Sequence, residues 1–514
     1  MCSRQLALTL LALSACGGTT GTSARDDAAS DASVSDTGML DAHPRDASKP
    51  VDAAHDRAAE GSVPHDAGID AVMDAVTVLD ARPESDVTQV PDARDSGPTD
   101  AGVDAPVVSP WSADLPSGAF SAVAVDSHDN TLAGGTTTSS SVGSPYFAQY
   151  TSTGAPAWQK QLSAAGATYG VATDALDNVL FVGNADAAID FGGGALQEGG
   201  YIVEYDTTGS YLFAKTFAGA VPFAVARAQS GWVIVGWYNG TVDFGGGPLP
   251  PTSDDGAFVL ELDSSGAYVF AVTFTGLGNS QAFSIAIDRS GDLVLAGSFD
   301  GSLDLGGGAM VGPMSGSGQT ASFVAMLDPT GHYLHQATFH VAGSDSVAGV
   351  SVDSSGSVYV GGTFDTTINL GGGSVDSQGQ RDIFLGKLDS SFAYVWGKSF
   401  GDSNDQLTAA TAVDPAGNVV IVGSMRGTVD FGGGPLSAPQ DDDQAFLARF
   451  DPSGNPLSTG IVPATTSSIG YAVAAPTSGP SDVIVGQFTG TLNLGQGPFT
   501  SSGSGDGFVA WWVP

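Results

Sequence analysis

Short apolar runs separated by polar turns recur along the chain from about residue 111 onward. In one copy, an apolar run ends in the turn 414–418 (Asp-Pro-Ala-Gly-Asn), and a second run, 419–423, follows directly. The segment 428–434 then ends in three glycines, and a third run lies at 445–450. Apolar runs of this length, bounded by Gly, Pro, Asn and Asp, are typical of strands. The pattern therefore predicts a repeated, all-β unit.

Seven copies of this unit align on the glycine that ends the second apolar run. The spacing between successive copies is 49 to 64 residues. A period of this length that contains only strand patterns favours a propeller over a helical solenoid. We therefore predict a seven-bladed β-propeller of four-stranded blades over residues 111–514. The aligned glycines are Gly134, Gly183, Gly236, Gly297, Gly361, Gly423 and Gly486.

Each copy supplies four expected strands, A to D. Strand A is short and rich in small residues, as at 121–125, which suits the crowded positions near the axis. Strand B is continuously apolar, as at 179–182, which predicts burial on both faces. Strand C alternates, as at 258–262, so we expect one of its faces to meet solvent. Strand D carries an aromatic residue four positions after a turn residue, in most copies a glycine: Trp158, Phe213, Phe270 and Trp396.

Asp-x-x-Gly elements close the expected hairpins. They occur between strands A and B, as at 288–291 and 353–356, and between C and D, as at 263–266 and 451–454. Aspartate accepts hydrogen bonds from its own turn and glycine supplies the positive φ, so a structural role is favoured over metal binding. The triple glycines, as at 192–194, are predicted to be tight bends, because no helix pattern follows to form a phosphate cradle.

The seventh copy has no fourth strand of its own. It supplies strand A near 471–474, strand B at 483–485 and strand C at 508–511, and the sequence then ends. At the other end of the repeats, 111–115 has the Trp-x-x-x-apolar form of a strand D. We predict that 111–115 pairs antiparallel with 508–513 and closes the propeller, because closure removes two open sheet edges.

The segment 353–363 (Asp-Ser-Ser-Gly-Ser-Val-Tyr-Val-Gly-Gly-Thr) closely resembles the SBBP-type bacterial β-propeller repeat. This resemblance covers most of 116–514 and implies the fold alone, since that family shares no activity or ligand. The pattern Asp-x-x-Gly-x-x-x-Trp is also similar to that of quinone-dependent dehydrogenase propellers. No matching cofactor site accompanies it, and we predict no cofactor.

Residues 1–16 form an expected export signal. Arg4 precedes an apolar stretch, 6–13, that is too short to span a bilayer. The segment 13–16 (Leu-Ser-Ala-Cys) resembles the lipobox of bacterial lipoproteins, which implies cleavage before Cys16 and lipidation of Cys16. The alternative is an ordinary secretory signal with an incidental cysteine. Gly17 follows where an aspartate often marks inner-membrane retention, so we expect the outer membrane or cell surface.

Residues 17–110 form an expected tether. Asp-Ala pairs recur among Pro, Ser, Gly and Thr, and aromatic residues are absent, so the segment is predicted to be disordered. The formal charge of the whole chain, -39, argues against a nucleic-acid partner and favours solubility as its purpose. The tether aspartates do not follow the Asp-x-Asp-x-Asp-Gly spacing of calcium loops, so the sequence gives little support for calcium binding there.

Candidate chemistry in the repeats is sparse. His128, His332, His335 and His340 are the histidines beyond the tether. On one strand, 332 and 335 point to opposite faces, so no metal site is predicted there. No serine, cysteine or acid lies in a recognisable nucleophile setting, and we predict no catalytic residue.

We expect a monomeric, lipid-anchored, surface-displayed propeller that acts as a binding module of the cell envelope for a protein or glycan. One alternative is an extracytoplasmic polysaccharide hydrolase or lyase with its site near the axis. Another is a structural component of a surface layer. Since short hairpins join A to B and C to D on one face, ligands are expected on the opposite face. That face carries the long connections 248–256, 309–322, 374–382, 401–407 and 435–445.

Overall fold

The computed structural model describes residues 111–512 except 138–142, 477–480, 496 and 504. The predicted signal, its lipidated Cys16 and the predicted tether all lie outside the described residues. Every regular element within the described residues is a strand. The prediction of an all-β domain is confirmed.

The described strands include seven four-stranded antiparallel sheets. Each of the first six is built from one copy of the repeat, and the sheets follow the order of the copies along the chain. Sheet 1 contains β2 (Gly118–Val125), β3 (Thr131–Thr137), β4 (Ser144–Tyr150) and β5 (Pro156–Gln161). Sheet 2 contains β6 (Gly166–Thr173), β7 (Val179–Ala185), β10 (Gly199–Tyr205) and β11 (Tyr211–Phe217). Sheet 3 contains β12 (Ala220–Arg227), β13 (Gly231–Gly240), β14 (Thr252–Asp263) and β15 (Tyr268–Thr273). Sheet 4 contains β17 (Ser280–Ile287), β18 (Leu293–Phe299), β21 (Ala321–Leu327) and β22 (Tyr333–Thr338).

The remaining three sheets follow the same order. Sheet 5 contains β24 (Asp345–Val352), β25 (Val358–Phe364), β28 (Asp382–Leu388) and β29 (Tyr394–Phe400). Sheet 6 contains β30 (Gln406–Val413), β31 (Val419–Met425), β34 (Gln444–Phe450) and β35 (Pro456–Val462). Sheet 7 contains β36 (Ser467–Ala474), β37 (Asp482–Thr489), β40 (Asp506–Trp512) and, from the start of the domain, β1 (Trp111–Leu115).

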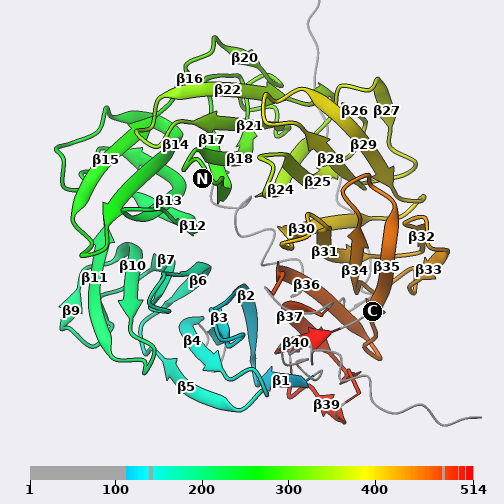
Figure 1. Cartoon of the computed structure of the whole chain (residues 1–514), viewed down its shortest axis with the longest axis horizontal. Helices are drawn as coiled ribbons and strands as arrows, with labels where there is room; N and C mark the ends of the chain where they lie inside the picture. The colour runs from blue at the N-terminus through cyan, green and yellow to red at the C-terminus, as the bar shows by residue number, and fades with distance from the viewer. Residues whose placement is uncertain (1–110, 138–142, 477–480, 496, 504, 513–514) are drawn as a thin grey trace, which may run out of the picture. The chain divides into compact units, whose positions relative to one another are not determined.

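The sheets follow one another around a ring (Figure 1). The first strand of each sheet contacts the first strand of the next, and β2 of sheet 1 contacts β36 and β37 of sheet 7. The apolar core consists of seven clusters, each of which joins two neighbouring sheets. Burial between sheets, rather than one central core, therefore provides most of the hydrophobic stabilisation.

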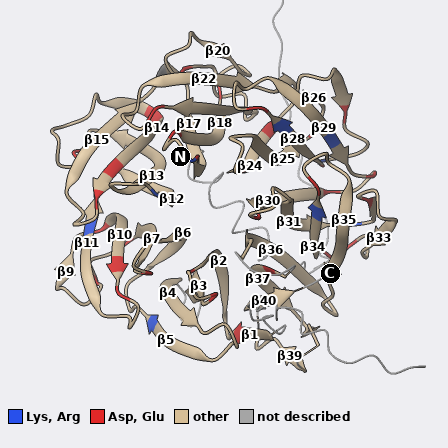
Figure 2. Cartoon of the chain, in the orientation of Figure 1, with Lys and Arg blue, Asp and Glu red and all other residues tan. Residues whose placement is uncertain are grey.

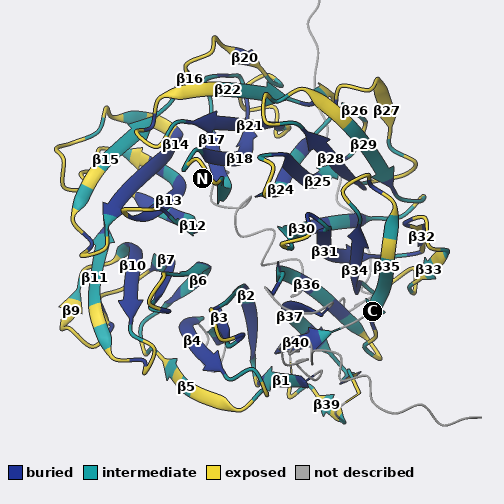
Figure 3. Cartoon of the chain, viewed as in Figure 1, coloured by how far each residue is buried: buried dark blue, intermediate teal, exposed yellow. Residues whose placement is uncertain are grey.

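The predicted exposure of strand C is wrong. Residues 256–262 of β14 are all buried, and Glu261 is only 5% exposed. The middle strands lie between two neighbouring sheets and are buried on both faces. The outermost strands, in contrast, carry exposed residues among partly buried ones (Figure 3). The polar residues of strand C are therefore buried groups that need partners, and most of them find one in the turn of their own sheet or in the next sheet.

The long B–C connections were expected to be loops. Most of them instead contain a further hairpin. These hairpins pair β8 (Ile189–Asp190) with β9 (Ala195–Leu196), β19 (Ser302–Asp304) with β20 (Met310–Val311), β26 (Thr367–Asn369) with β27 (Ser374–Asp376), β32 (Thr428–Asp430) with β33 (Pro435–Ser437) and β38 (Thr491–Asn493) with β39 (Pro498–Thr500). The strands β16 (Thr275–Leu277) and β23 (His340–Ala342) extend two of them to three strands.

The triple glycines form the tight bends of these hairpins, as predicted. In the first hairpin, the Asp190 carboxylate accepts hydrogen bonds from the backbone N–H groups of Gly192 and Gly194, at 2.8 and 2.9 Å. Gly192 and Gly194 both have positive φ. The Tyr211 ring lies where a side chain at Gly193 would be. The glycines are therefore required by backbone conformation and by the close approach of an aromatic ring.

The first strand of the domain completes the last sheet. β1 pairs antiparallel with β40, from Trp111 opposite Trp511 to Leu115 opposite Gly507. The Trp111 ring packs on the turn glycine Gly154 of sheet 1. Trp158 packs in the same way on Gly209 of sheet 2, so Trp111 occupies the position of a strand-D aromatic residue.

Candidate functional site

The Asp-x-x-Gly turns have the structural role predicted for them. In the turn 414–418, the Oδ1 atom of Asp414 accepts hydrogen bonds from the N–H groups of Ala416 and Asn418, at 2.9 and 2.8 Å. Gly417 supplies the positive φ, 83°. In the A–B turns of sheets 1 and 2, the glycine position is taken by Asp129 (φ 59°) and Asp177 (φ 61°). Non-glycine residues with positive φ are uncommon, and such residues cluster at functional sites.

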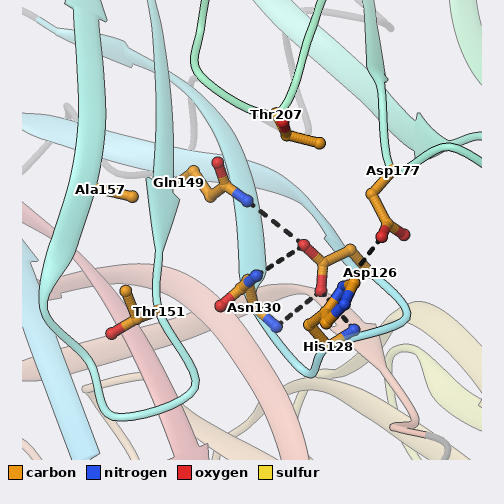
Figure 4. Close-up of a pocket in the computed structure, with 8 residues that line it drawn as sticks. All are labelled: Asp126, His128, Asn130, Gln149, Thr151, Ala157, Asp177 and Thr207. Carbon is orange, nitrogen blue, oxygen red and sulfur yellow. Dashed lines mark hydrogen bonds and ion pairs between the residues drawn. The ribbon is translucent and has the colours of Figure 1, made fainter.

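Asp177 lies at the edge of a pocket between sheets 1 and 2 (Figure 4). The pocket has a volume of about 280 Å³. Both A–B turns, both C–D turns and strands β4 and β5 contribute to it. The pocket therefore lies on the face of the A–B and C–D turns, which we call the hairpin face. The lining residues are Asp126, His128, Asn130, Gln149, Thr151, Ala157, Asp177 and Thr207.

The Asp126 carboxylate joins its own turn to β4. Its Oδ1 accepts hydrogen bonds from the N–H groups of His128 and Asn130, at 2.9 and 2.8 Å. Its Oδ2 accepts from the side-chain amides of Asn130 and Gln149, at 2.8 and 3.2 Å. Asp126 is 3% exposed. These contacts fix the carboxylate at the floor of the pocket.

The Asp177 carboxylate crosses from sheet 2 to the turn of sheet 1. It accepts hydrogen bonds from the Ser127 N–H at 3.0 Å and the Ser127 hydroxyl at 2.8 Å. Its Oδ2 lies 2.9 Å from Nδ1 of His128, whose side chain is 74% exposed. Burial raises the pKa of Asp177, but the Ser127 hydrogen bonds and the His128 charge outweigh it and lower the net pKa. Asp177 is therefore a carboxylate held in its charged form.

Gln149 of β4 is the buried polar side chain of the pocket. It is 4% exposed, and its Nε2 donates to Asp126. The carboxylate needs a donor, and this fixes the orientation of the amide. Within the described residues, Gln149 Oε1 accepts no hydrogen bond. Figure 4 shows it turned away from Asp126, on the side where Thr207 lies.

The residue at the position of Gln149 differs in the other sheets, and we call this position the strand-C clamp. In three sheets the clamp residue reaches the first or second residue of strand B in the next sheet. Glu204 accepts from Nε1 of Trp232, Arg449 pairs with Asp482, and Trp511 donates to Thr131. The clamp residues are Gln149, Glu204, Glu261, Met326, Lys387, Arg449 and Trp511.

In sheet 2, which follows the sheet of Gln149, the first residue of strand B is Val179, a valine that is 1% exposed. Valine has no polar group for the amide oxygen, which explains why Gln149 Oε1 lacks the interaction that the clamp makes elsewhere. The result is a buried acceptor oriented into a pocket that already contains two carboxylates. An unsatisfied buried acceptor costs about 1–3 kcal/mol unless a ligand or water satisfies it.

In sheets 5 and 6 the clamp is a cation. Lys387 Nζ lies 3.3 Å from Oδ2 of Asp353, the turn aspartate of its own sheet, and 3.3 Å from the carbonyl oxygen of Pro452 in the C–D turn of sheet 6. Arg449 contacts Asp414 of its own sheet at 3.2 Å and Asp482 of sheet 7 at 3.1 Å. Figure 2 shows blue segments on β28 and β34, the strands that carry these residues.

Sequence reasoning did not find this pocket. It treated His128 as an isolated residue and expected ligands on the opposite face. The useful signal was the replacement of the turn glycine by aspartate in two successive copies, at Asp129 and Asp177. The pairing of Asp177 with His128 depends on contact between sheets, which the spacing of residues does not reveal.

The other histidines of the domain lie apart. His332 contacts Thr330 and Asp328 of its own turn, and His335 stacks on Phe392 at 5.5 Å. His340 pairs with Asp345 at 2.7 Å. Within the described residues, Asp126, His128 and Asp177 form a group of potential metal ligands whose ligand atoms lie within 4.8 Å of one another.

Among the described residues, no helix is long and apolar enough to span a bilayer. No family model matches the chain, and no curated protein matches it. The resemblance to SBBP-type repeats therefore stays a prediction.

The chain is similar to several solved structures. The WD40 domain of Pan2 from Neurospora crassa is 10% identical, with 77% of this chain and 90% of that chain covered and a TM-score of 0.43. A virginiamycin B lyase from Staphylococcus aureus is 8% identical, with 79% and 100% covered and a TM-score of 0.41. Sqt1 from Chaetomium thermophilum is 11% identical, with 72% and 94% covered and a TM-score of 0.42. Likeness of this degree carries no argument, so the propeller-like fold rests on the sheets and contacts described above.

Proposed function

We propose that this chain is a closed, seven-bladed β-propeller that acts as a binding module of the cell envelope. The seven sheets are its blades, and β1 closes the ring by pairing with β40. A ring of sheets packed face to face is rigid, and its connections can vary without disturbing the core. Binding is favoured over polysaccharide cleavage because the Asp126, His128 and Asp177 group lies between two hairpin turns rather than at the innermost strands.

The observation that carries this proposal is an exposed apolar surface on the face of the B–C and D–A connections. In the small sheet of β16, β19 and β20, Leu277 and Val311 lie on either side of Ser302 and share one face. They are 73% and 75% exposed, and Met314 in the next turn is 79% exposed. The other face packs Leu303 and Met310 into the core.

These three side chains suit a protein partner. Burial of exposed aliphatic side chains against a partner removes them from water and lowers the free energy of the complex. Glycans, in contrast, commonly stack on aromatic rings, and these three side chains are aliphatic. The small sheet of β23, β26 and β27 also carries exposed aliphatic residues, Val341 and Val375, at 47% and 40%. We name the surface of Leu277, Val311 and Met314 the apolar edge.

Footprinting on intact cells tests the apolar edge. In the full-length chain, residues 275–277 and 310–314 are expected to gain protection from hydroxyl radicals in the envelope relative to the purified protein. Replacement of Leu277, Val311 and Met314 by serine should remove that protection. Leu176, which is 75% exposed on the hairpin face, provides a matched control, and Leu176→Ser should leave the protection unchanged. Protection centred on residue 176 instead would contradict the proposed face.

We also propose that the module is displayed at the outer membrane or cell surface through a lipid on Cys16. The support is the lipobox-like segment 13–16 and the charged, aromatic-free segment 17–110. Cys16→Ala should move the protein from the membrane fraction to the soluble fraction and from the detergent phase to the aqueous phase. Cys2→Ala is the matched control, since Cys2 precedes the cleavage position. Unchanged membrane association of Cys16→Ala would exclude the anchor.

A further inference from the structure

We propose that Met314 is a site of reversible oxidation by peroxides, and that its sulfoxide releases the protein partner of the apolar edge. The effect on binding rests on the proposed function, whereas the oxidation itself can be measured on the purified chain alone.

The methionines of the described residues differ widely in exposure. Met314 is 79% exposed, whereas Met310 of β20 is 7% exposed and packs into the core. Met326 and Met425 lie on middle strands and are 3% and 0% exposed. Oxidation of sulfur side chains follows their access to solvent. A peroxide in the surrounding water therefore reaches Met314 before any other methionine of the described residues.

The backbone beside Met314 is held in place, so its side chain belongs to an ordered surface. The N–H group of Gly301 donates a hydrogen bond to the carbonyl oxygen of Pro313 at 2.6 Å. A side chain at Gly301 would meet both the carbonyl oxygen of Leu277 and the Cβ atom of Ser315, so the segments that carry Leu277 and Met314 lie side by side. A chemical change at Met314 therefore acts within the apolar edge itself.

The reaction needs only the sulfur atom and an oxidant. A lone pair of the Met314 thioether attacks one oxygen of hydrogen peroxide, and the S–O bond forms as the O–O bond breaks. The leaving hydroxide takes the proton of the transferred oxygen and becomes water, so sulfur is oxidised by two electrons and the peroxide is reduced. A methionine sulfoxide reductase reverses the step with two thiols, which become a disulfide while the oxygen leaves as water.

Sulfoxide formation changes the surface that the partner must cover. Methionine is apolar, flexible and polarisable, which suits contact with a protein, whereas its sulfoxide is polar. Leu277 and Val311 carry no atom that a peroxide oxidises, so the change is confined to one of the three side chains. The sulfoxide oxygen must give up its hydrogen bonds to water when the partner covers it, which should weaken binding by about tenfold or more.

Peptide mapping by mass spectrometry after treatment with hydrogen peroxide tests the oxidation. In the purified full-length chain, Met314 is expected to oxidise at least about tenfold faster than Met310, and the two rates should become similar in urea, where the fold no longer covers Met310. Met39 and Met73 lie outside the described residues, and their peptides are read separately. Equal rates for Met310 and Met314 in the folded chain would overturn the proposal.

Binding is tested with protein that has been treated with peroxide, freed of it and added to envelopes of cells that lack this chain. Hydroxyl-radical protection at Leu277 and Val311 should need about tenfold more of the treated wild type than of the untreated protein. Methionine sulfoxide reductase with dithiothreitol should restore it. Met314→Leu keeps an apolar surface without the sulfur, so treatment should leave its protection unchanged. Met314→Gln, which is polar without oxidation, should behave as the treated wild type does.

The outcomes separate this inference from the proposed function. Equal protection of treated and untreated wild type, with Met314 oxidised, would overturn the proposed release and leave the apolar edge as a binding surface. Loss of protection in treated Met314→Leu would also overturn it, because the effect would then come from another methionine. Absence of protection in the untreated wild type would instead overturn the apolar edge as a binding surface, and the release of a partner with it.

Discussion

Deletion of residues 111–115 is expected to destabilise the whole ring rather than to fray one end. β1 contributes Trp111 (7% exposed) and Leu115 (5% exposed) to the core cluster that joins sheets 7 and 1. Loss of one buried tryptophan side chain costs about 3–5 kcal/mol, against a total stability of about 5–15 kcal/mol for a typical domain. The deletion also exposes the hydrogen-bonding edge of β40.

Guanidinium unfolding, followed by tryptophan fluorescence and by circular dichroism, measures this effect. Both signals should shift together to lower denaturant concentration, because the lost contacts join two sheets of one ring. Deletion of residues 106–110 is the matched control and should leave the midpoint in place. An unchanged midpoint after deletion of 111–115 would refute closure by β1.

Arg449→Met is expected to reduce the free energy of unfolding by about 3–5 kcal/mol, the cost of leaving buried charges without their partner. The Arg449 side chain is 7% exposed and contacts Asp414 and Asp482, whose side chains are 10% and 0% exposed. Arg381→Met is the control. Arg381 pairs with Asp405 at the surface, with its side chain 38% exposed, and its loss should cost less than about 1 kcal/mol.

The effect of Arg449→Met should depend on pH. Burial raises the pKa of Asp482 to about 7 from its ordinary value of 3.8, although the Arg449 charge lowers it. Between these values the folded protein binds more protons than the unfolded chain, so stability falls as pH rises through this window. Without Arg449 the pKa of Asp482 rises further. Urea unfolding should therefore show a larger loss at pH 8 than at pH 5, and an equal loss at both would contradict this role of Asp482.

The sequence predicted the four strands of each repeat because local patterns determine them. Residues 419–423 read as a buried strand, and they lie in β31 between two other strands of sheet 6. The turn 414–418 was predicted from aspartate and glycine alone, and its hydrogen bonds are local. Trp111 was assigned to the last sheet by analogy with Trp158, and it packs on a turn glycine in the same way.

The errors arose where contacts between sheets override local patterns. Alternation at 258–262 suggested an exposed face, but the Glu261 side chain is buried and contacts Ser230. The same reasoning left Gln149 unremarked, since nothing near it in sequence shows that it is buried and bonded to Asp126. The candidate site therefore required the structure, because three of its groups come from separate turns and strands.

The pairing of β1 with β40 also has a consequence for the order of folding. Trp111 is synthesised about 400 residues before its partner Trp511. Contacts so distant in sequence form late, because a long loop must close before they stabilise the chain. A chain that stops before β40 would leave β1 without a partner although every residue between them is present. The first strand of the domain to be synthesised is thus expected to be the last to pair, and a chain without β40 is expected not to complete its last sheet.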